Sequence, residues 1–291
     1  MTHDDGFEVT FHGVRGSTPC HGPEILRYGG NTSCVSLDIP GSGPILFDLG
    51  TGVRYFGQAW PADRPFRATC LVSHLHWDHI QGLPFFPPVL RPESHMRIIA
   101  PRQDGPRSLR EVFVETICPP LFPIDLAVLP GELTFEAVGD ETFTIDDEIE
   151  VMSRFIPHVG TTCGYRLTWH GISVAYLSDH QMPVDGSFAA TDGARQLCEG
   201  ADLVIHDGQY TWEEFAHKRD WGHCTTEYAV WLAAEVGAKQ VALFHHDPTH
   251  DDDTLDMIGK HAERCGASLG VDVVTAREGL TLRVGGGSRS D

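Results

Sequence analysis

The amino-acid sequence predicts an α/β protein in which two mixed sheets face each other and helices cover their outer sides. Three observations support this fold class. Short apolar runs with strand-like patterning alternate with segments whose apolar residues recur at helical spacing. The chain has 291 residues, of which 41% are hydrophobic, and a chain of this size can bury a full core. Several apolar runs end directly in histidine or aspartate, which places polar side chains at strand ends.

The expected elements follow one another without a linker or an internal repeat. Strands are predicted over residues 7–12, 34–39, 45–48, 68–73, 96–100, 134–138, 148–155, 165–169, 172–177, 203–206, 238–244, 271–275 and 280–284. Helices are predicted over residues 108–117, 189–199, 226–235 and 254–265. Residues 81–88 and 118–123 are too rich in proline for a regular element. We expect one domain over residues 1–284 and a disordered tail over residues 285–291.

Composition limits the classes of partner. The formal net charge is −20, which disfavours nucleic acid because such binding depends on neutralising phosphates with lysine and arginine. No apolar run approaches the roughly 20 residues that span a membrane. The N-terminal segment lacks the pattern of an export signal, and the 8 cysteines include no C-x-x-C pair. We therefore expect a cytoplasmic protein, a homodimer, that acts on a small molecule.

The most informative stretch is His74-Leu75-His76-Trp77-Asp78-His79, directly after the apolar residues 70–73. Residues two apart on an extended segment point the same way, so His74 and His76 can bind one ion. Asp78 and His79 lie on the following turn and can face a second ion. Imidazole and carboxylate without thiolate are ligands typical of zinc, manganese or iron. The sequence therefore predicts a site for two metal ions.

The spacing H-x-H-x-D-H resembles the signature of the metallo-β-lactamase superfamily, whose fold is an αββα sandwich. The resemblance implies further ligands after later apolar strands, at His158, Asp179 and His245. It assigns the first metal to His74, His76 and His158, the second to Asp78, His79 and His245, and gives Asp179 to both. His246 is the alternative to His245. About two zinc ions per chain are expected, with manganese as the alternative.

Other residues match positions around the metals in this superfamily. Asp48 follows the apolar residues 45–47, and the resemblance implies that it holds a ligand histidine without touching metal. The pairs His206-Asp207 and Gly222-His223 resemble motifs of the phosphodiesterase branch, which includes ribonuclease Z and cyclic nucleotide phosphodiesterases. There a carboxylate orients the histidine that protonates the leaving oxygen. Asp207 is one methylene shorter than the family's glutamate, so the sequence leaves its contact with His223 open.

Two N-terminal motifs also resemble this branch. Residues 13–19 and 28–33 contain glycines that allow a loop to approach the metals, which makes Arg15 a candidate phosphate ligand and Asn31 a candidate hydrogen-bonding support for substrate binding. Ordinary turn formation is an equally good interpretation of both motifs.

The resemblance implies a phosphodiesterase in which metal-bound hydroxide attacks phosphorus. Asp78 would orient the hydroxide and His223 would protonate the leaving group. The acidic charge favours a 3′,5′-cyclic nucleotide or a related cyclic phosphate, and residues 83–86 and 120–123 would roof a compact pocket. One alternative is a ribonuclease Z-like enzyme for tRNA 3′ processing, for which the sequence has no basic arm. Another is a non-catalytic scaffold on the same fold.

Overall fold

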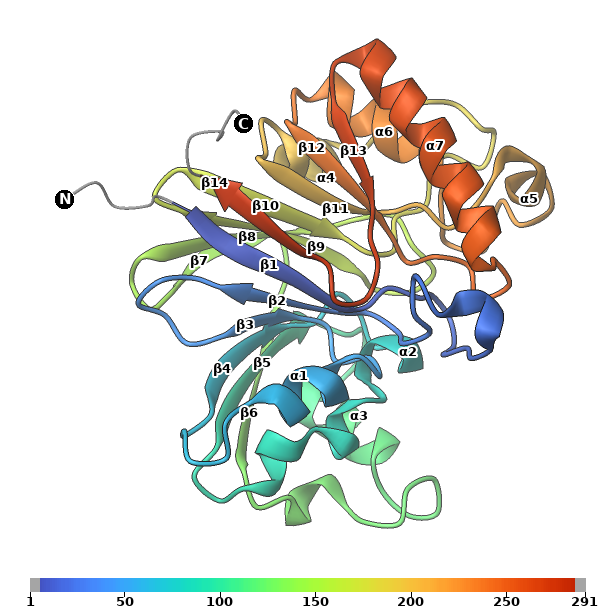
Figure 1. Cartoon of the computed structure of the whole chain (residues 1–291). Helices are drawn as coiled ribbons and strands as arrows, with labels where there is room; N and C mark the ends of the chain where they lie inside the picture. Colours follow the sequence, from blue (N-terminus) through green and yellow to red (C-terminus); the bar gives the residue numbers. More distant parts are fainter. Residues whose placement is uncertain (1–5, 286–291) are drawn as a thin grey trace.

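The computed structural model describes residues 6–285 and places two seven-stranded sheets face to face, with helices on the outer faces (Figure 1). The strand order is β14-β1-β2-β3-β4-β5-β6 in the first sheet and β13-β12-β11-β10-β9-β8-β7 in the second. The α/β sandwich predicted from the sequence is therefore confirmed.

In the first sheet β3 to β6 run parallel, whereas β14, β1, β2 and β3 pair antiparallel. Its strands are β14 (Thr281–Gly285), β1 (Gly6–Gly13), β2 (Cys34–Asp38), β3 (Ile45–Phe47), β4 (Arg67–Leu71), β5 (His95–Pro101) and β6 (Glu132–Val138).

In the second sheet β10 to β13 run parallel and β7 to β10 antiparallel. Its strands are β13 (Asp272–Thr275), β12 (Gln240–Phe244), β11 (Leu203–Asp207), β10 (Ile172–Leu177), β9 (Cys163–Trp169), β8 (Ile149–Phe155) and β7 (Glu141–Ile145). Because ligand groups collect where parallel strands end, this topology fixes the position of the site.

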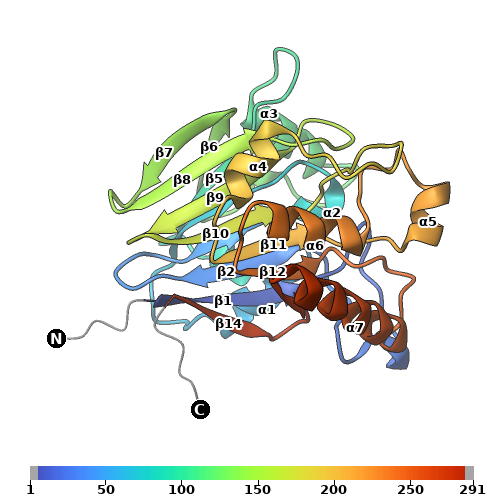
Figure 2. The ribbon, with the colours of Figure 1, turned by 90° about the horizontal axis from the view of Figure 1, so that it is seen from above.

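Helices cover both outer faces (Figures 1 and 2). α1 (Val53–Ala59) and α3 (Leu109–Thr116) pack on the first sheet, and α4 (Asp192–Cys198), α6 (Thr226–Glu235) and α7 (Asp252–Leu269) pack on the second. The short helices α2 (Trp77–Ile80) and α5 (Trp212–His217) lie at the end of the sandwich away from the chain termini (Figure 1). Four 3-10 turns complete the helical elements of the described residues: Pro23–Ile25, Leu83–Phe85, Pro87–Leu90 and Leu126–Val128.

The main core lies between the sheets. Phe47 of β3 stacks on Tyr176 of β10 with ring centroids 4.5 Å apart, so one aromatic pair joins the two layers. Every residue of β10 is buried, as expected for a strand between two covered faces. Separate apolar clusters lie under the helices on each side.

Four helices and strands were not predicted from the sequence. They are α1, α2, β7 and α5. β7 is an edge strand whose residues are mostly exposed, so it carries little apolar patterning. α7 is longer than expected, because Asp251 caps its first turn and Gly270, at φ 78°, ends it in the left-handed conformation. Gly285 belongs to β14, one residue beyond the expected domain, and the rest of the expected tail, 286–291, lies outside the described residues.

Candidate active site

The expected metal ligands come together at one end of the sandwich, where strands from both sheets end. His74 and His76 follow β4, Asp78 and His79 lie on α2, His158 follows β8, Asp179 follows β10, and His245 follows β12. Their donor atoms fall into overlapping groups of three in which all atoms lie within 4.8 Å of one another.

The first group consists of His74, His76 and His158. His76 Nδ1 lies 2.8 Å from His74 Nε2 and 3.3 Å from His158 Nε2. Asp179 Oδ2 lies 3.8 Å from His74 Nε2 and 3.6 Å from His158 Nε2. Burial lowers the pKa of all three histidines, and the neutral imidazole that results is the form that binds metal.

The second group consists of Asp78, His79 and His245. Asp78 Oδ2 lies 3.1 Å from His79 Nε2 and 3.2 Å from His245 Nε2. The other oxygen of Asp179, Oδ1, lies 3.2 Å from His79 Nε2 and 3.3 Å from His245 Nε2. Asp179 thus presents one oxygen to each group, which is the arrangement expected of a bridging carboxylate.

The donor set fits metal ions better than a purely hydrogen-bonded cluster. His79 Nε2 and Asp179 Oδ1 are buried without a hydrogen-bond partner although they face each other. Buried polar atoms are rarely left unpaired, because an unpaired group loses its hydration. Nitrogen and carboxylate donors that converge in this way form a typical zinc or manganese ligand set.

Asp48 contacts the second group through His79. Its carboxylate lies 2.7 Å from His79 Nδ1 and accepts hydrogen bonds from Ser73 N at 2.7 Å and Tyr176 Oη at 2.7 Å. Asp48 itself makes no contact with the clustered donor atoms other than through His79. The sequence anticipated this position for Asp48 but gave no signal for Ser73 or Tyr176.

Two other ligand histidines are also held through their second nitrogen. His245 Nδ1 lies 2.8 Å from Gln209 Oε1, and His158 Nδ1 lies 2.7 Å from the carbonyl oxygen of Gly222. Such partners fix the tautomer and direct the free nitrogen. Sequence reasoning missed Gln209 and the Gly222 carbonyl, because a glutamine and a backbone oxygen have no characteristic spacing.

Backbone strain marks two of these positions. Asp48 has φ 59° and His245 has φ 57°, the left-handed conformation that non-glycine residues rarely adopt. His246, the alternative ligand, points elsewhere: its Nε2 lies 2.8 Å from the carbonyl of Ala276, and burial lowers its pKa to about 3. The structure therefore brings His245, and not His246, into the cluster.

A histidine–carboxylate pair lies beside the cluster. His223 Nδ1 is 2.8 Å from Asp207 Oδ2, so the shorter aspartate does reach the histidine. The His223 ring lies 5.1 Å from that of His245 and 5.4 Å from that of His158. Burial opposes protonation of His223, but the carboxylates of Asp207, Asp179 and Asp78 together outweigh it and raise the pKa of the ring. Thr225 caps α6, so His223 is not needed for that purpose.

A buried polar network supports Asp207. Its Oδ2 accepts a hydrogen bond from the backbone N–H of His180 at 3.1 Å, and its Oδ1 accepts one from Gln209 N at 2.9 Å. His180 Nδ1 lies 2.9 Å from His206 Nε2. No role was predicted for His180, because its position next to Asp179 was the only signal that the sequence contains.

The expectation for Arg15 is corrected by the structure. Arg15 is fully buried, and its guanidinium donates to the carbonyls of Gly29 at 2.8 Å, His250 at 2.7 Å and Asp247 at 3.2 Å. These bonds tie the loop after β1 to the loop after β12, so Arg15 cannot reach a phosphate in the pocket.

Asn31 is likewise a structural residue. Its side-chain Nδ2 donates to Glu278 Oε2 at 3.0 Å, and its carbonyl accepts from Arg15 N at 2.9 Å. It supports the N-terminal loop instead of the substrate, which agrees with the alternative of ordinary turn chemistry.

A pocket of about 860 Å³ opens above the cluster. Asp78, Asp179, His223 and His245 form its floor, together with His76 and His158, and Trp77 and Trp221 form part of its wall. Neither 83–86 nor 120–123 lines it, so the expectation that these segments roof the pocket is wrong. Leu83 and Phe86 are instead buried in the core under α1, where apolar packing holds them.

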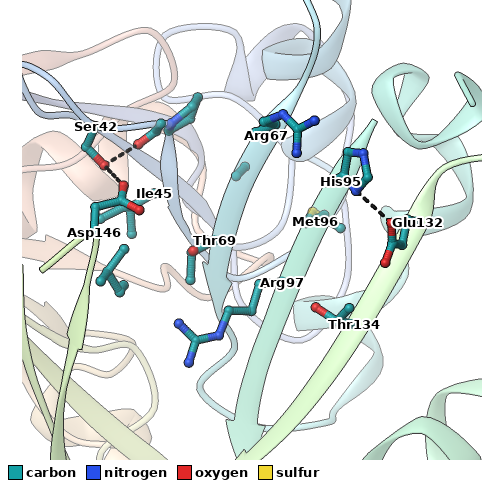
Figure 3. A pocket seen from close by; sticks show the side chains of 14 residues that line it. Ser42, Ile45, Arg67, Thr69, His95, Met96, Arg97, Glu132, Thr134 and Asp146 are labelled. Carbon is teal, nitrogen blue, oxygen red and sulfur yellow. Dashed lines mark hydrogen bonds and ion pairs between the residues drawn. The ribbon is translucent and has the colours of Figure 1, made fainter. Parts of the chain in front are cut away.

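A second pocket, of about 340 Å³, lies where β3, β4, β5 and β6 begin, whereas the candidate ligands His74 and His76 follow the end of β4. Figure 3 shows the side chains that line this pocket. Arg67, His95 and Arg97 line it from β4 and β5, and His95 pairs with Glu132 at 2.7 Å. Among the described residues, none of the potential metal-binding groups includes a residue of this pocket. The candidate metal ligands therefore lie at the other end of the sandwich, away from this pocket.

Comparisons with known proteins identify the family to which the chain is similar. Residues 45–246 match the family described as the beta-lactamase superfamily domain. The ribonuclease Z of Synechococcus sp. (strain CC9311) is 26% identical, with 84% of this chain and 88% of the relative covered.

Two solved structures share the fold. The metallo-β-lactamase fold protein YhfI from Bacillus subtilis has a TM-score of 0.72 and 20% identity, covering 96% of this chain and 99% of YhfI. The short form of human tRNase Z has a TM-score of 0.66 and 19% identity, covering 94% of this chain and 98% of the human one.

The fold and the histidine–aspartate cluster define the class of metal-dependent hydrolases. Because the family match spans more than half of the sequence, the chain belongs to the beta-lactamase superfamily. No helix in the described part of the chain is both long and apolar enough to cross a membrane.

Proposed function

We propose that the protein is a phosphodiesterase that binds two metal ions, through His74, His76, His158 and Asp179 on one side and Asp78, His79, His245 and Asp179 on the other. When bound, such metals polarise the phosphoryl oxygens and lower the pKa of a water molecule toward neutrality. The remaining chemistry falls to the protein side chains, which orient the water, hold the substrate and supply a proton.

The observation that carries this proposal is the Asp207–His223 pair. Nδ1 of His223 is engaged by Asp207 at 2.8 Å, which leaves Nε2 as the nitrogen for a substrate. His223 is only 7% exposed but lines the pocket, next to both groups of donors. A protonated histidine there can donate to an alkoxide that leaves phosphorus.

Asp78 has a second role besides binding metal. Burial disfavours its charge, but His79 and His245 hold the pKa of Asp78 well below its usual range, so it stays ionised. Ser17 N donates to Asp78 Oδ2 at 2.8 Å and fixes the carboxylate. We infer that the ionised Asp78 orients the attacking water by accepting a hydrogen bond.

The related proteins favour RNA as the substrate. The curated relatives are named ribonuclease Z, which supports the tRNA-processing alternative better than a cyclic nucleotide and removes the basis for excluding nucleic acid. We therefore propose a ribonucleotide phosphodiester as the substrate, with the 3′ end of precursor tRNA as the first to test.

A cyclic nucleotide is the second candidate, and the local charge favours it. Among residues 6–285, Lys218 is the only lysine or arginine that lines the pocket, and Asp220 and Asp247 line it too. A pocket with this balance suits a ligand with a single phosphate better than a long polyanion.

The test is a substrate panel with metal-replete protein. Precursor tRNA, 3′,5′-cyclic nucleotides and bis(p-nitrophenyl) phosphate would be compared by kcat/KM, with His223→Ala as a parallel variant. The proposal expects cleavage of at least one diester and preference for precursor tRNA. Preference for the cyclic nucleotide would promote the second candidate, and activity toward a lactam or thioester alone would refute the phosphodiesterase proposal.

A further inference from the structure

Two large apolar side chains are exposed at the pocket. Trp77 is 65% and Trp221 is 60% exposed, and both line the cavity above the cluster. Tryptophan is usually well buried, because its ring contributes a large apolar surface. Two exposed indoles in one concave site therefore indicate a ligand that covers them.

The backbone holds both tryptophans close to the reacting centre. Trp77 lies between the ligands His76 and Asp78 on the first turn of α2. Trp221 directly precedes Gly222, whose carbonyl engages His158 Nδ1 at 2.7 Å. A side chain at position 222 would place its Cβ 2.4 Å from His158 Nδ1 and would need φ 96°, so the chain is tightly fixed there.

A partly buried cation supports Trp221. Lys218 Nζ lies 2.9 Å from Asp247 Oδ2, 4.8 Å from the ring centre of Tyr210 and 5.7 Å from that of Trp221. The cation is thus held against aromatic faces. Its charge is already paired with Asp247, so recognition at this wall depends on the indole surfaces more than on net positive charge.

We propose that Trp77 and Trp221 form a stacking surface that binds an unpaired nucleobase next to the scissile phosphodiester, with Lys218 as a positioning residue for Trp221. This inference rests on the proposed phosphodiesterase function and extends it, because it selects diesters that carry a base. Every base has a π face, so the surface accepts purines and pyrimidines alike, and stacking on an aromatic side chain contributes substantially to binding.

Paired substrates with one leaving group test the proposal. Thymidine 5′-(p-nitrophenyl phosphate) carries a nucleoside and methyl p-nitrophenyl phosphate does not, so the ratio of their kcat/KM values measures recognition of the nucleoside, whose base is the part that can stack on an indole. Trp77→Ala and Trp221→Ala should each lower this ratio about tenfold or more, mainly through KM of the thymidine diester. Trp212→Ala is the matched control, since Trp212 is 40% exposed but does not line the pocket.

A binding measurement separates failure of the stacking surface from failure of the enzymatic proposal. Isothermal titration calorimetry with adenosine 5′-monophosphate should show saturable binding to the wild type and to Trp212→Ala, and Kd should rise about tenfold or more in the Trp77→Ala, Trp221→Ala double variant. Wild-type protein that cleaves neither diester yet shows this pattern would refute only the phosphodiesterase function. An unchanged ratio of kcat/KM values, or an equal Kd in the double variant, would overturn the stacking surface.

Discussion

At the residue scale, three of the candidate ligand histidines depend on a neighbour that holds the second ring nitrogen. Asp48 engages His79, Gln209 engages His245, and the Gly222 carbonyl engages His158. Because a histidine can bind metal through either nitrogen, the neighbour decides which one faces the cluster. The left-handed backbone of Asp48 is one cost of that arrangement.

Substitution of Asp48 should weaken metal binding without abolishing it. We expect Asp48→Asn to lower metal affinity about 10–100-fold, because the amide keeps the left-handed backbone accessible but removes the charge that orients His79. Competition with a chromogenic chelator would measure the effect. Asp48→Ala adds backbone strain, so it should be less stable than Asp48→Asn; unchanged affinity in both variants would contradict the role of Asp48.

Removal of His223 should affect substrates according to their leaving group. His223→Ala should keep its metals and lower kcat about 10²–10⁴-fold for an alkoxide leaving group, because the proton donor is lost. The loss should shrink for p-nitrophenolate, a weaker base that needs less protonation. His261→Ala is the control, since His261 is exposed on α7 and pairs with Glu227. An equal loss for both leaving groups would indicate that His223 positions the substrate instead.

At the scale of elements, the loops after β1 and β12 depend on each other through Arg15. Its buried guanidinium reaches three backbone carbonyls, and its backbone N–H donates to the Asn31 carbonyl at 2.9 Å. Gly16 N in turn donates to the carbonyl of His246 at 2.9 Å, next to the ligand His245. Arg15 and Gly16 therefore support the end of β12.

Arg15→Met should destabilise the fold. The variant leaves the carbonyls of Gly29, Asp247 and His250 without their donor in a buried place, and we expect a loss of about 3 kcal/mol or more in the free energy of unfolding. Urea unfolding of the metal-replete protein would measure it. Arg27→Met should cost much less, because the Arg27 side chain and its ion pairs lie at the surface, where solvent screens the charges. A large rise in KM with unchanged stability would restore Arg15 as a phosphate ligand.

At the scale of the whole molecule, both sheets are required to complete the site. The first sheet supplies His74, His76, Asp78 and His79, and the second supplies His158, Asp179 and His245. Metal binding should therefore hold the two layers together, and the folded state should gain stability from the ions. The expected homodimer and the cytoplasmic location stay predictions.

Metal analysis is the measurement at this scale. We expect about two metal ions per chain in carefully purified, metal-replete protein, with zinc as the first candidate. Asp179→Ala should lose or disorder both, because one oxygen of Asp179 faces each group. Chelation should lower the melting temperature of the wild type and change that of the variant little. A single tightly bound ion in the wild type would refute the dinuclear arrangement.

The sequence by itself determined the fold class, most of the strand segments along the chain and the ligand types, because the spacing within 74–79 and the apolar runs before His158, Asp179 and His245 are local properties. Tertiary structure decided which side chains face one another. It placed His245 rather than His246 in the cluster, brought Asp207 to His223, and buried Arg15 among carbonyls. It also gave the pocket a wall of Trp77 and Trp221 in place of the proline-rich segments. The reason is physical: side-chain direction at a strand end depends on backbone torsion and on groups supplied by distant segments, and neither is encoded in local spacing.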